Sequence, residues 1–340
     1  MIDLRSDTVS RPTAAMRAAM ANAEVGDDVL EGDPTVRALE EDVARRLGME
    51  SALYFPSGTM ANQTAIWLHA EPGTEALCDA RAHVYDWEGA GAAVLRGVQL
   101  RPVTAAGETI RAADVERGLR APSRYAPRAT LLCLENTHNG AGGAVTPLPD
   151  LLALGECGRA AGLKVHLDGA RLWNAHIATG TPLADFARVA DTVMVSFSKG
   201  LGAPVGAALV GTAALMRAGW EVRKRLGGGM RQAGIIAAGA LHGVQHHLQR
   251  LQEDHANAAT FAAAVAGAGG ARPVAPDTNI VMIDLRSGQR SADVVAAALR
   301  DGVALSGWSA TRVRAVFHLD VSSADAAAAG AVVARALASA

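Results

Sequence analysis

The stretch Ser196–Gly202, which reads SFSKGLG, decides how we interpret this chain. Its lysine, Lys199, comes directly after the apolar run Thr192–Phe197, which is typical of a buried strand in a parallel sheet. A lysine at the carboxyl end of such a strand points into the crevice where these sheets bind ligands. Partial desolvation there lowers the pKa of a lysine and frees its amine for imine chemistry. The alternative is a strand-end lysine that reaches into solvent.

Lysine is rare in this sequence, which gives Lys199 more weight. Among the 32 lysine and arginine residues, only Lys164, Lys199 and Lys224 are lysine. Arginine can replace lysine on a surface, but it stays protonated and cannot form an imine. Each remaining lysine is therefore a stronger candidate for a functional role than a lysine usually is.

The rest of the chain alternates between strand-like and helix-like stretches. Asp33 and Pro34 are typical of a helix start, and that helix runs to Gly48. A turn at residues 56–59 opens a second helix that ends near His69. Further helices are predicted at 148–161 and 212–225, and strands at 51–55, 76–78, 98–103, 130–134, 164–167, 192–197 and 207–210. This alternation predicts an α/β fold whose large domain has a mostly parallel central sheet between two layers of helices.

The last third of the chain predicts a smaller α/β domain. A long helix is expected from about Met230 to Leu251, followed by strands at Ile280–Leu285 and Arg312–His318 with helices around them. The 340 residues suit one large domain with a smaller one attached. We expect a large domain at residues 1–247, whose N-terminal segment contributes to the active site, and a small C-terminal domain at 248–340.

Composition excludes several classes of function. The formal net charge of -2 offers no basic field for nucleic acid or for an anionic membrane. The three cysteines lie far apart, the N-terminus has no apolar signal core, and the apolar runs are too short for a membrane span. We therefore expect a cytoplasmic protein. His246, His247 and His255 have no carboxylate at a known ligand spacing, so no metal site is predicted.

A second motif, VHLDGAR at Val165–Arg171, ends another apolar strand with Asp168. A carboxylate at that edge can pair with a protonated pyridine nitrogen, which makes the ring an electron sink. The alternative is that Asp168 caps the helix that contains Arg171. The lysine motif one strand later, at the same edge of a parallel sheet, favours the first interpretation.

Two shorter motifs are also candidates. The turn at residues 56–62, PSGTMAN, opens a helix whose free N–H groups suit a phosphate, with hydroxyls from Ser57 and Thr59 beside Gly58. An ordinary helix cap is the alternative. In the segment 83–88, HVYDWE, His83 can stack on a planar cofactor or act as a base. A partly buried loop histidine is the alternative there.

Seven ordered blocks of the sequence resemble one known family. They are residues 1–9, 25–29, 134–140, 166–171, 198–206, 227–232 and 318–322. These blocks span nearly the whole chain and are similar to those of the low-specificity L-threonine aldolases. Those enzymes depend on pyridoxal phosphate (PLP) and have the aspartate-aminotransferase-like fold, fold type I. The resemblance implies a homotetramer, a dimer of dimers with active sites at a dimer interface.

The resemblance also implies roles for residues around the cofactor ring. Lys199 would carry PLP as a Schiff base. Asp168 would face the pyridine nitrogen, Arg171 the ring hydroxyl oxygen, and His83 would stack on the ring.

Further roles concern the phosphate and the substrate. Residues 57–59 would bind the phosphate, which Arg231 would reach from a neighbouring subunit with Lys224 nearby. Ser6 and Arg314 would hold the substrate carboxylate, and a guanidinium suits a bidentate grip.

The implied reaction is retro-aldol cleavage of L-threonine, L-allo-threonine and related β-hydroxy-α-amino acids to glycine and an aldehyde. His83 is the first candidate for the base, directly or through a water. Two positions depart from the family: Tyr125 stands where relatives often have a histidine, and Leu30 where many have a tyrosine. Tyr125 is thus a second candidate for the base. Both departures predict a preference for larger or aromatic side chains, such as that of phenylserine.

Three other functions compete with this one. Another PLP reaction on the same fold, β-elimination or transamination, is not excluded by fold alone. A binding or regulatory protein that lost the chemistry would not need Lys199. A Rossmann dehydrogenase is disfavoured because the glycines at residues 89–91 do not follow a strand.

Overall fold

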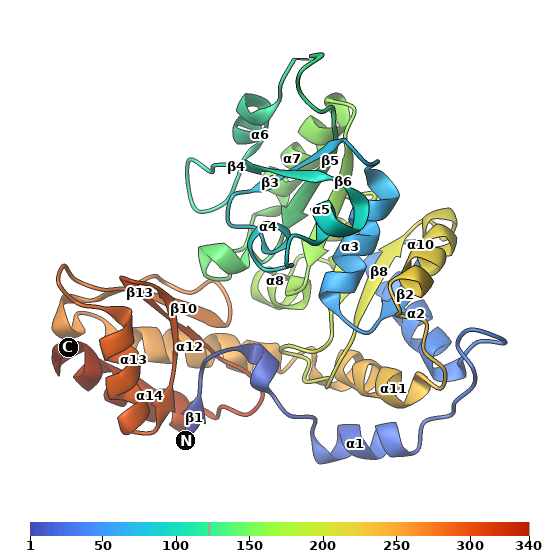
Figure 1. Ribbon diagram of the computed structural model, residues 1–340. Helices are drawn as coiled ribbons and strands as arrows, with labels where there is room; N and C mark the ends of the chain where they lie inside the picture. The colour runs from blue at the N-terminus through green and yellow to red at the C-terminus, as the bar shows by residue number, and fades with distance from the viewer. Residues whose placement is uncertain (122, 340) are drawn as a thin grey trace.

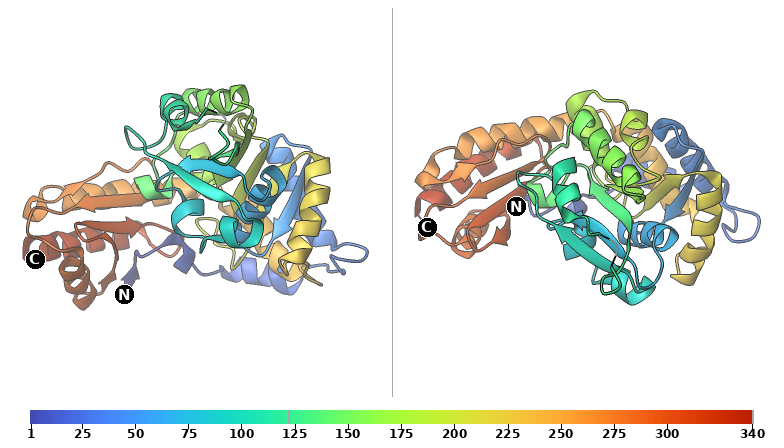
Figure 2. Two further views of the ribbon diagram at one scale, coloured as in Figure 1. Left: turned by 45° about the horizontal axis from the view of Figure 1, so that its top comes forward. Right: turned by 90° about the horizontal axis from the view of Figure 1, so that it is seen from above.

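The computed structural model describes residues 1–121 and 123–339. Figure 1 shows a large domain and a smaller one beside it, with both chain termini on the smaller domain. Two further views show the small domain extending from one side of the large domain (Figure 2). In the described part of the chain, no helix is long and apolar enough to cross a membrane.

Seven strands within the described residues form the central sheet of the large domain, in the order β2-β8-β7-β6-β5-β3-β4. Only β8 runs antiparallel to its neighbours in this sheet, and the remaining pairs are parallel. The strands are β2 (Ser51–Phe55), β3 (Glu75–Asp79), β4 (Gln99–Val103), β5 (Ala129–Glu135), β6 (Lys164–Gly169), β7 (Thr192–Ser196) and β8 (Ala207–Gly211). The predicted, mostly parallel sheet is confirmed.

Successive residues of each strand point to opposite sides of this sheet. Both sides carry apolar side chains, and helices cover both faces. On β5, Leu132 and Leu134 belong to one apolar cluster and Leu131 and Cys133 to another. The helices of this domain are α1 (Ala14–Ala21), α2 (Pro34–Leu47), α3 (Gly58–His69), α4 (His83–Asp86), α5 (Gly91–Arg96), α6 (Ala112–Gly118), α7 (Leu148–Ala160), α8 (Leu172–Thr179), α9 (Leu183–Ala187), α10 (Ala213–Arg225) and α11 (Gly234–His242).

The start and end of α2 follow the predicted signals. The Asp33 side chain accepts the backbone N–H groups of Thr35 and Val36, and Pro34 occupies the first turn. The helix ends at Gly48, whose φ of 63° is left-handed and therefore favours glycine.

The small domain is built on a four-stranded antiparallel sheet in the order β12-β13-β10-β9. Its elements are α12 (Leu251–Val265), β9 (Arg272–Pro273), β10 (Ile280–Asp284), α13 (Ser291–Arg300), β12 (Ser306–Ser309), β13 (Arg312–Val316) and α14 (Ser323–Ser339). The two predicted strands correspond to β10 and β13, whereas β12 was not predicted.

The N-terminus also packs on the small domain. β1 (Ile2–Asp3) pairs in parallel with β11 (Val303–Ala304), and Leu4 is buried in the core of that domain. The chain then passes to the large domain. The division at residue 247 stays a prediction.

The single long helix expected from about Met230 to Leu251 is wrong in detail. Its middle, Gly243–His247, is a π-helix, and α12 begins only at Leu251. Residues before Gly234 are not helical, since the carbonyl of Arg231 accepts the N–H of Asp28 instead. Gly243 lies against Leu201, where an added Cβ would be 2.8 Å from the carbonyl oxygen. Local contacts with other segments therefore override the helical pattern here.

Candidate active site

A pocket of about 300 Å³ lies where the N-terminal segment, the large domain and the small domain meet. It is lined by Ser6, Thr8, His83, Trp87, Asn139, Arg171, Lys199, Trp308 and Arg314. Five of these residues, Ser6, His83, Arg171, Lys199 and Arg314, are site residues predicted from the sequence. The fold therefore brings together residues that are more than 300 positions apart in the chain.

Lys199 follows β7 at the carboxyl edge of the central sheet, as its motif predicts. Burial lowers the pKa of its ammonium group, and the positive charge of Arg171 lowers it further, against the attraction of Asp7 and Asp168. A lowered pKa leaves a larger fraction of the amine neutral, which is the form that attacks a carbonyl carbon. The arrangement can therefore form an imine.

Asp168 lies near the end of β6 with only 3% of its surface exposed. Its carboxylate accepts one hydrogen bond from Asn62 Nδ2 at 2.8 Å and one from the Ala170 backbone N–H at 3.0 Å. The helix cap at the start of α8 is Arg171, and no side chain caps it. Asp168 thus does not cap that helix, and its carboxylate keeps free capacity to accept a proton donor.

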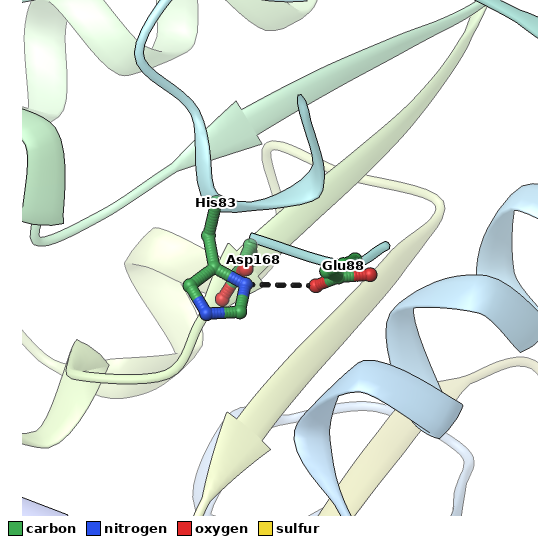
Figure 3. Close-up of side chains that lie close together, drawn as sticks. All are labelled: His83, Glu88 and Asp168. Carbon is green, nitrogen blue, oxygen red and sulfur yellow. Dashed lines mark hydrogen bonds and ion pairs between the residues drawn. The ribbon is translucent and has the colours of Figure 1, made fainter. Parts of the chain in front are cut away.

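His83 is held at the start of α4 by two carboxylates. Its Nδ1 lies 2.9 Å from Oε1 of the buried Glu88, and its backbone N–H donates to Glu135 Oε2 at 2.8 Å. Figure 3 shows the imidazole turned so that its other ring nitrogen points away from Glu88. The carboxylate must accept, so Nδ1 carries a hydrogen and Nε2 is the nitrogen left for chemistry.

The charges around His83 set its protonation. Burial lowers the pKa of the imidazole, but the hydrogen bond to Glu88 and the negative charges of Asp168 and Glu88 outweigh burial and raise the pKa above its usual value. Glu88 is in turn fixed by hydrogen bonds from Asn62 Nδ2 at 2.8 Å and Gln63 Nε2 at 2.6 Å. Glu88 stands in the same sequence segment as His83, but its role cannot be predicted from that segment alone.

The hydrogen-bond network continues from Asn62 to buried residues of β6 and β7. Asn62 Oδ1 lies 3.0 Å from Nε2 of the fully buried His166, whose Nδ1 is 3.0 Å from Thr192 Oγ1. Burial lowers the pKa of His166 to about 4, so this imidazole is neutral at physiological pH. His166 thus anchors Asn62, which contacts both acidic groups, Asp168 and Glu88.

The side chains of His83, Glu88 and Asp168 place one possible ligand atom each within 4.8 Å of one another. Hydrogen bonding accounts for this closeness, because Asn62 joins the two carboxylates and Glu88 accepts from His83. The expectation that the site holds no metal stays a prediction.

Arg171 is buried and pairs with Asp7. Nε donates to Oδ2 at 2.7 Å, Nη2 donates to Oδ1 at 2.8 Å, and Nη1 reaches Asn139 Oδ1 at 3.2 Å. Neither Asp7 nor Asn139 was singled out from the sequence, although both stand inside blocks that carry the family resemblance. Arg171 faces the pocket with its position fixed by these contacts.

Arg314 projects from β13 into the same pocket. Nη1 donates to Asn139 Oδ1 at 3.0 Å and Nη2 to the Arg5 carbonyl at 3.3 Å, whereas the buried Nε has no partner among the described residues. Burial, together with the charge of Arg171, lowers the pKa of Arg314 to about 10, so it is still charged at neutral pH. Its guanidinium lines the pocket, where it suits a carboxylate. Ser6 lies nearby, and its Oγ accepts the Thr8 hydroxyl at 2.8 Å.

The predicted phosphate turn opens α3. The Ser57 hydroxyl accepts the Met60 N–H at 3.2 Å and so acts as the helix cap, while Gly58 and Thr59 form the first turn. The cap interpretation is therefore correct for Ser57, and phosphate binding by residues 57–59 stays a prediction.

Four more residues singled out from the sequence are, like Asp168 and residues 57–59, not among those that line this pocket. Lys224 is exposed on α10, and Arg231 is exposed and pairs with Asp27 at 3.2 Å. Tyr125 is 99% exposed and Leu30 is 76% exposed. A single chain does not bring these side chains to Lys199, so the roles assigned to Lys224, Arg231 and Tyr125 stay predictions.

The donor set fits PLP. Lys199 offers an amine of lowered pKa, Asp168 a buried carboxylate that can accept a pyridine N–H, and His83 an imidazole. These groups suit the aldehyde carbon, the ring nitrogen and the ring face of PLP, respectively. The guanidinium of Arg314, which lines the pocket, adds a position for the carboxylate of an amino acid.

Comparison with known proteins agrees with this geometry. The Beta-eliminating lyase family matches residues 3–287. Low-specificity L-threonine aldolase 1 of Arabidopsis thaliana is 41% identical over 334 residues, which cover 95% of this chain and 93% of that protein. Low specificity L-threonine aldolase of Escherichia coli K12 is 42% identical over 323 residues, covering 95% of each chain.

Solved structures share the fold. The Leishmania major threonine aldolase superposes with a TM-score of 0.84 at 19% identity, covering 99% of this chain and 100% of that one. A structure of SPT with PLP superposes with a TM-score of 0.73 at 19% identity, covering 98% of this chain and 87% of that one. Fold type I is thereby confirmed. The chain belongs to the Beta-eliminating lyase family of PLP-dependent enzymes and, within it, to the low-specificity L-threonine aldolases.

Proposed function

We propose that this protein cleaves L-threonine, L-allo-threonine and related β-hydroxy-α-amino acids, including phenylserine, to glycine and an aldehyde. The observation that carries the proposal is the meeting of Lys199, His83 and Arg314 in one pocket. These groups supply an imine-forming amine, a base and a carboxylate anchor. The named activities of relatives at 41% and 42% identity support the same reaction.

Lys199 would hold PLP through Nζ, with Asp168 against the pyridine nitrogen and residues 57–59 against the phosphate. When bound, PLP supplies an electron-accepting ring that takes up the electron pair of the broken Cα–Cβ bond. The N–H of Arg314 and the hydroxyl of Ser6 bind the substrate carboxylate and so fix which bond at Cα is cleaved.

His83 takes the proton of the β-hydroxyl group on Nε2, while Glu88 holds Nδ1. As that proton leaves, the oxygen forms the carbonyl of the departing aldehyde and the Cα–Cβ bond breaks. A proton returned to Cα completes glycine. Tyr125 remains the second candidate for the base. It would act in the pocket of a neighbouring subunit, or in its own pocket after a movement of its loop.

β-Elimination is the alternative favoured by a specific observation, the match to the Beta-eliminating lyase family. Product analysis separates the two. Retro-aldol cleavage of L-threonine yields glycine and acetaldehyde, whereas elimination of water yields a keto acid and ammonia. Glycine and acetaldehyde in equal amounts from the PLP-loaded protein, and none from Lys199→Ala, are the expected result. Keto acid and ammonia as main products would replace our proposal with elimination.

We also propose a homotetramer, a dimer of dimers, that acts in the cytoplasm. Arg231 and Lys224 lie outside the pocket of their own chain, and Arg231 would complete the phosphate site of a neighbour. Mixing inactive Lys199→Ala and inactive Arg231→Ala subunits should restore part of the activity, because some hybrid sites contain both native residues. A monomeric mass by sedimentation, with no restored activity, would rule out shared sites.

A further inference from the structure

We infer that Trp87 and Trp308 form a substrate-selecting aromatic wall at the pocket, and that this wall favours substrates with an aromatic ring on Cβ. The inference rests on the proposed aldol cleavage and adds the residues that choose the side chain. Trp87 follows α4 in the large domain, and Trp308 lies on β12 in the small domain. Their ring centroids are 5.6 Å apart at an interplanar angle of 36°.

Trp87 is placed to meet the group attached to Cβ. It directly follows α4, four residues after His83, and its backbone N–H donates to the His83 carbonyl at 2.9 Å. Residues four apart share one helix face. A substrate whose β-hydroxyl group contacts His83 therefore places the other substituent of that carbon near Trp87, which lines the same pocket.

Trp308 lies beside the residue proposed to bind the carboxylate end of the substrate. Its ring lies 4.6 Å from the guanidinium carbon of Arg314, the proposed carboxylate anchor. Arg314 therefore contacts the indole while its guanidinium also lines the pocket, where a carboxylate can bind. An amino acid held by Arg314, with its β-hydroxyl group beside His83, therefore places its side chain near the two indoles.

The exposure of Trp87 argues for a ligand. It is 55% exposed although tryptophan has the largest apolar side chain, and it lines the pocket. Indoles prefer offset or edge contacts with another aromatic ring, and such contacts add to the effect of apolar burial. A phenyl group on Cβ would make such aromatic contacts with the two indoles.

The test compares L-threo-phenylserine with L-threonine in the PLP-loaded protein. We expect the ratio of the two kcat/KM values to fall about fivefold to tenfold in Trp87→Ala and in Trp308→Ala. Trp308→Phe, which keeps an aromatic ring, should retain most of the ratio. Trp220→Ala is the matched control, because Trp220 lies on α10 outside this pocket.

A binding measurement supplies a second readout that does not depend on bond cleavage. L-Phenylalanine and L-alanine carry the same carboxylate and amine but no β-hydroxyl group, and each can be titrated through the visible spectrum of the bound cofactor. The wall predicts that phenylalanine binding weakens more than alanine binding in both Trp→Ala variants.

Two outcomes would overturn the inference. An equal loss with both substrates and both ligands would mean that the tryptophans only brace the two domains. An unchanged ratio would mean that the ring of phenylserine does not contact them. Failure of the proposed function looks different, because the wild-type protein would then release glycine from neither substrate while phenylalanine binding could still be measured.

Discussion

Arg171 and Asp7 form a buried pair with two parallel hydrogen bonds, 2.7 Å from Nε to Oδ2 and 2.8 Å from Nη2 to Oδ1. The pair joins the N-terminal segment, whose first strand belongs to the small domain, to the start of α8 in the large domain. Burial alone raises the pKa of Asp7, but the charge and hydrogen bonds of Arg171 hold it well below its usual range. Arg171, which lines the pocket, is therefore held in place by a buried ion pair.

Asp7→Asn should destabilise the protein by about 3–5 kcal/mol, because it leaves the Arg171 charge buried without its partner. Since the pKa of Asp7 is lowered in the folded state, its contribution is fully present above the unfolded value of about 3.9 and is lost as the pH falls below it. Urea unfolding at neutral pH measures the change. Asp3→Asn is the control, because Asp3 pairs with the exposed Arg5 and should change stability by less than about 1 kcal/mol. Equal effects of the two variants would contradict this prediction.

Glu88→Gln should move the acidic limb of the kcat/KM pH profile to lower pH. The base must be neutral to take a proton, so activity falls as the pH drops through the pKa of His83. Glu88 helps to raise that pKa, and removing its charge lowers it. Glu135→Gln is the control, because Glu135 binds the backbone N–H of His83 rather than its ring. An acidic limb that stays in place in Glu88→Gln would mean that another group controls it.

His83→Asn should reduce kcat for L-threonine by about 10²–10⁴-fold, the usual contribution of a general base. The visible spectrum of the variant reports whether the cofactor is still bound, which separates loss of the base from loss of PLP. A loss below about tenfold, with the cofactor retained, would transfer the role to Tyr125 or to a water. Tyr125→Phe would then decide between them.

Arg314→Lys should raise KM for L-threonine by at least about tenfold. Lysine keeps the charge but lacks the planar pair of N–H groups, and a hydrogen bond to a charged group is worth about 1.5–3 kcal/mol. Arg312→Lys is the matched control on the same strand, since Arg312 binds the half-exposed Asp284 at 2.5 Å instead of facing the pocket. A similar rise in both variants would point to a general effect on β13.

The sequence predicted the parts of this site that depend on local pattern. Lys199 and Asp168 end apolar strands of one sheet, and that pattern alone places them at the same edge. Contacts between distant segments, such as the one that fixes Arg171, could not be predicted in the same way. Asp7 meets Arg171 across 164 positions of sequence, and no periodicity encodes such a contact.

Other features could not be predicted because a strand is short or because the contacting residues lie on another segment or subunit. Trp308 lies in a four-residue strand with glycine and two serines, which carries little apolar pattern. The long helix expected near Met230 failed because a π-helix and contacts with Leu201 interrupt it. Arg231 and Tyr125 are exposed in a single chain, so their proposed roles depend on a second subunit that sequence pattern does not describe.

The most direct test of the account is to reduce the PLP-loaded protein with borohydride and identify the modified lysine by peptide mass spectrometry. The chain has only Lys164, Lys199 and Lys224 as lysines, so two of the three serve as internal controls. We predict that one phosphopyridoxyl group is attached to Lys199 and that Lys164 and Lys224 are unmodified. Modification at either of those lysines instead, or none at all, would contradict the assignment of Lys199 as the residue that carries the cofactor.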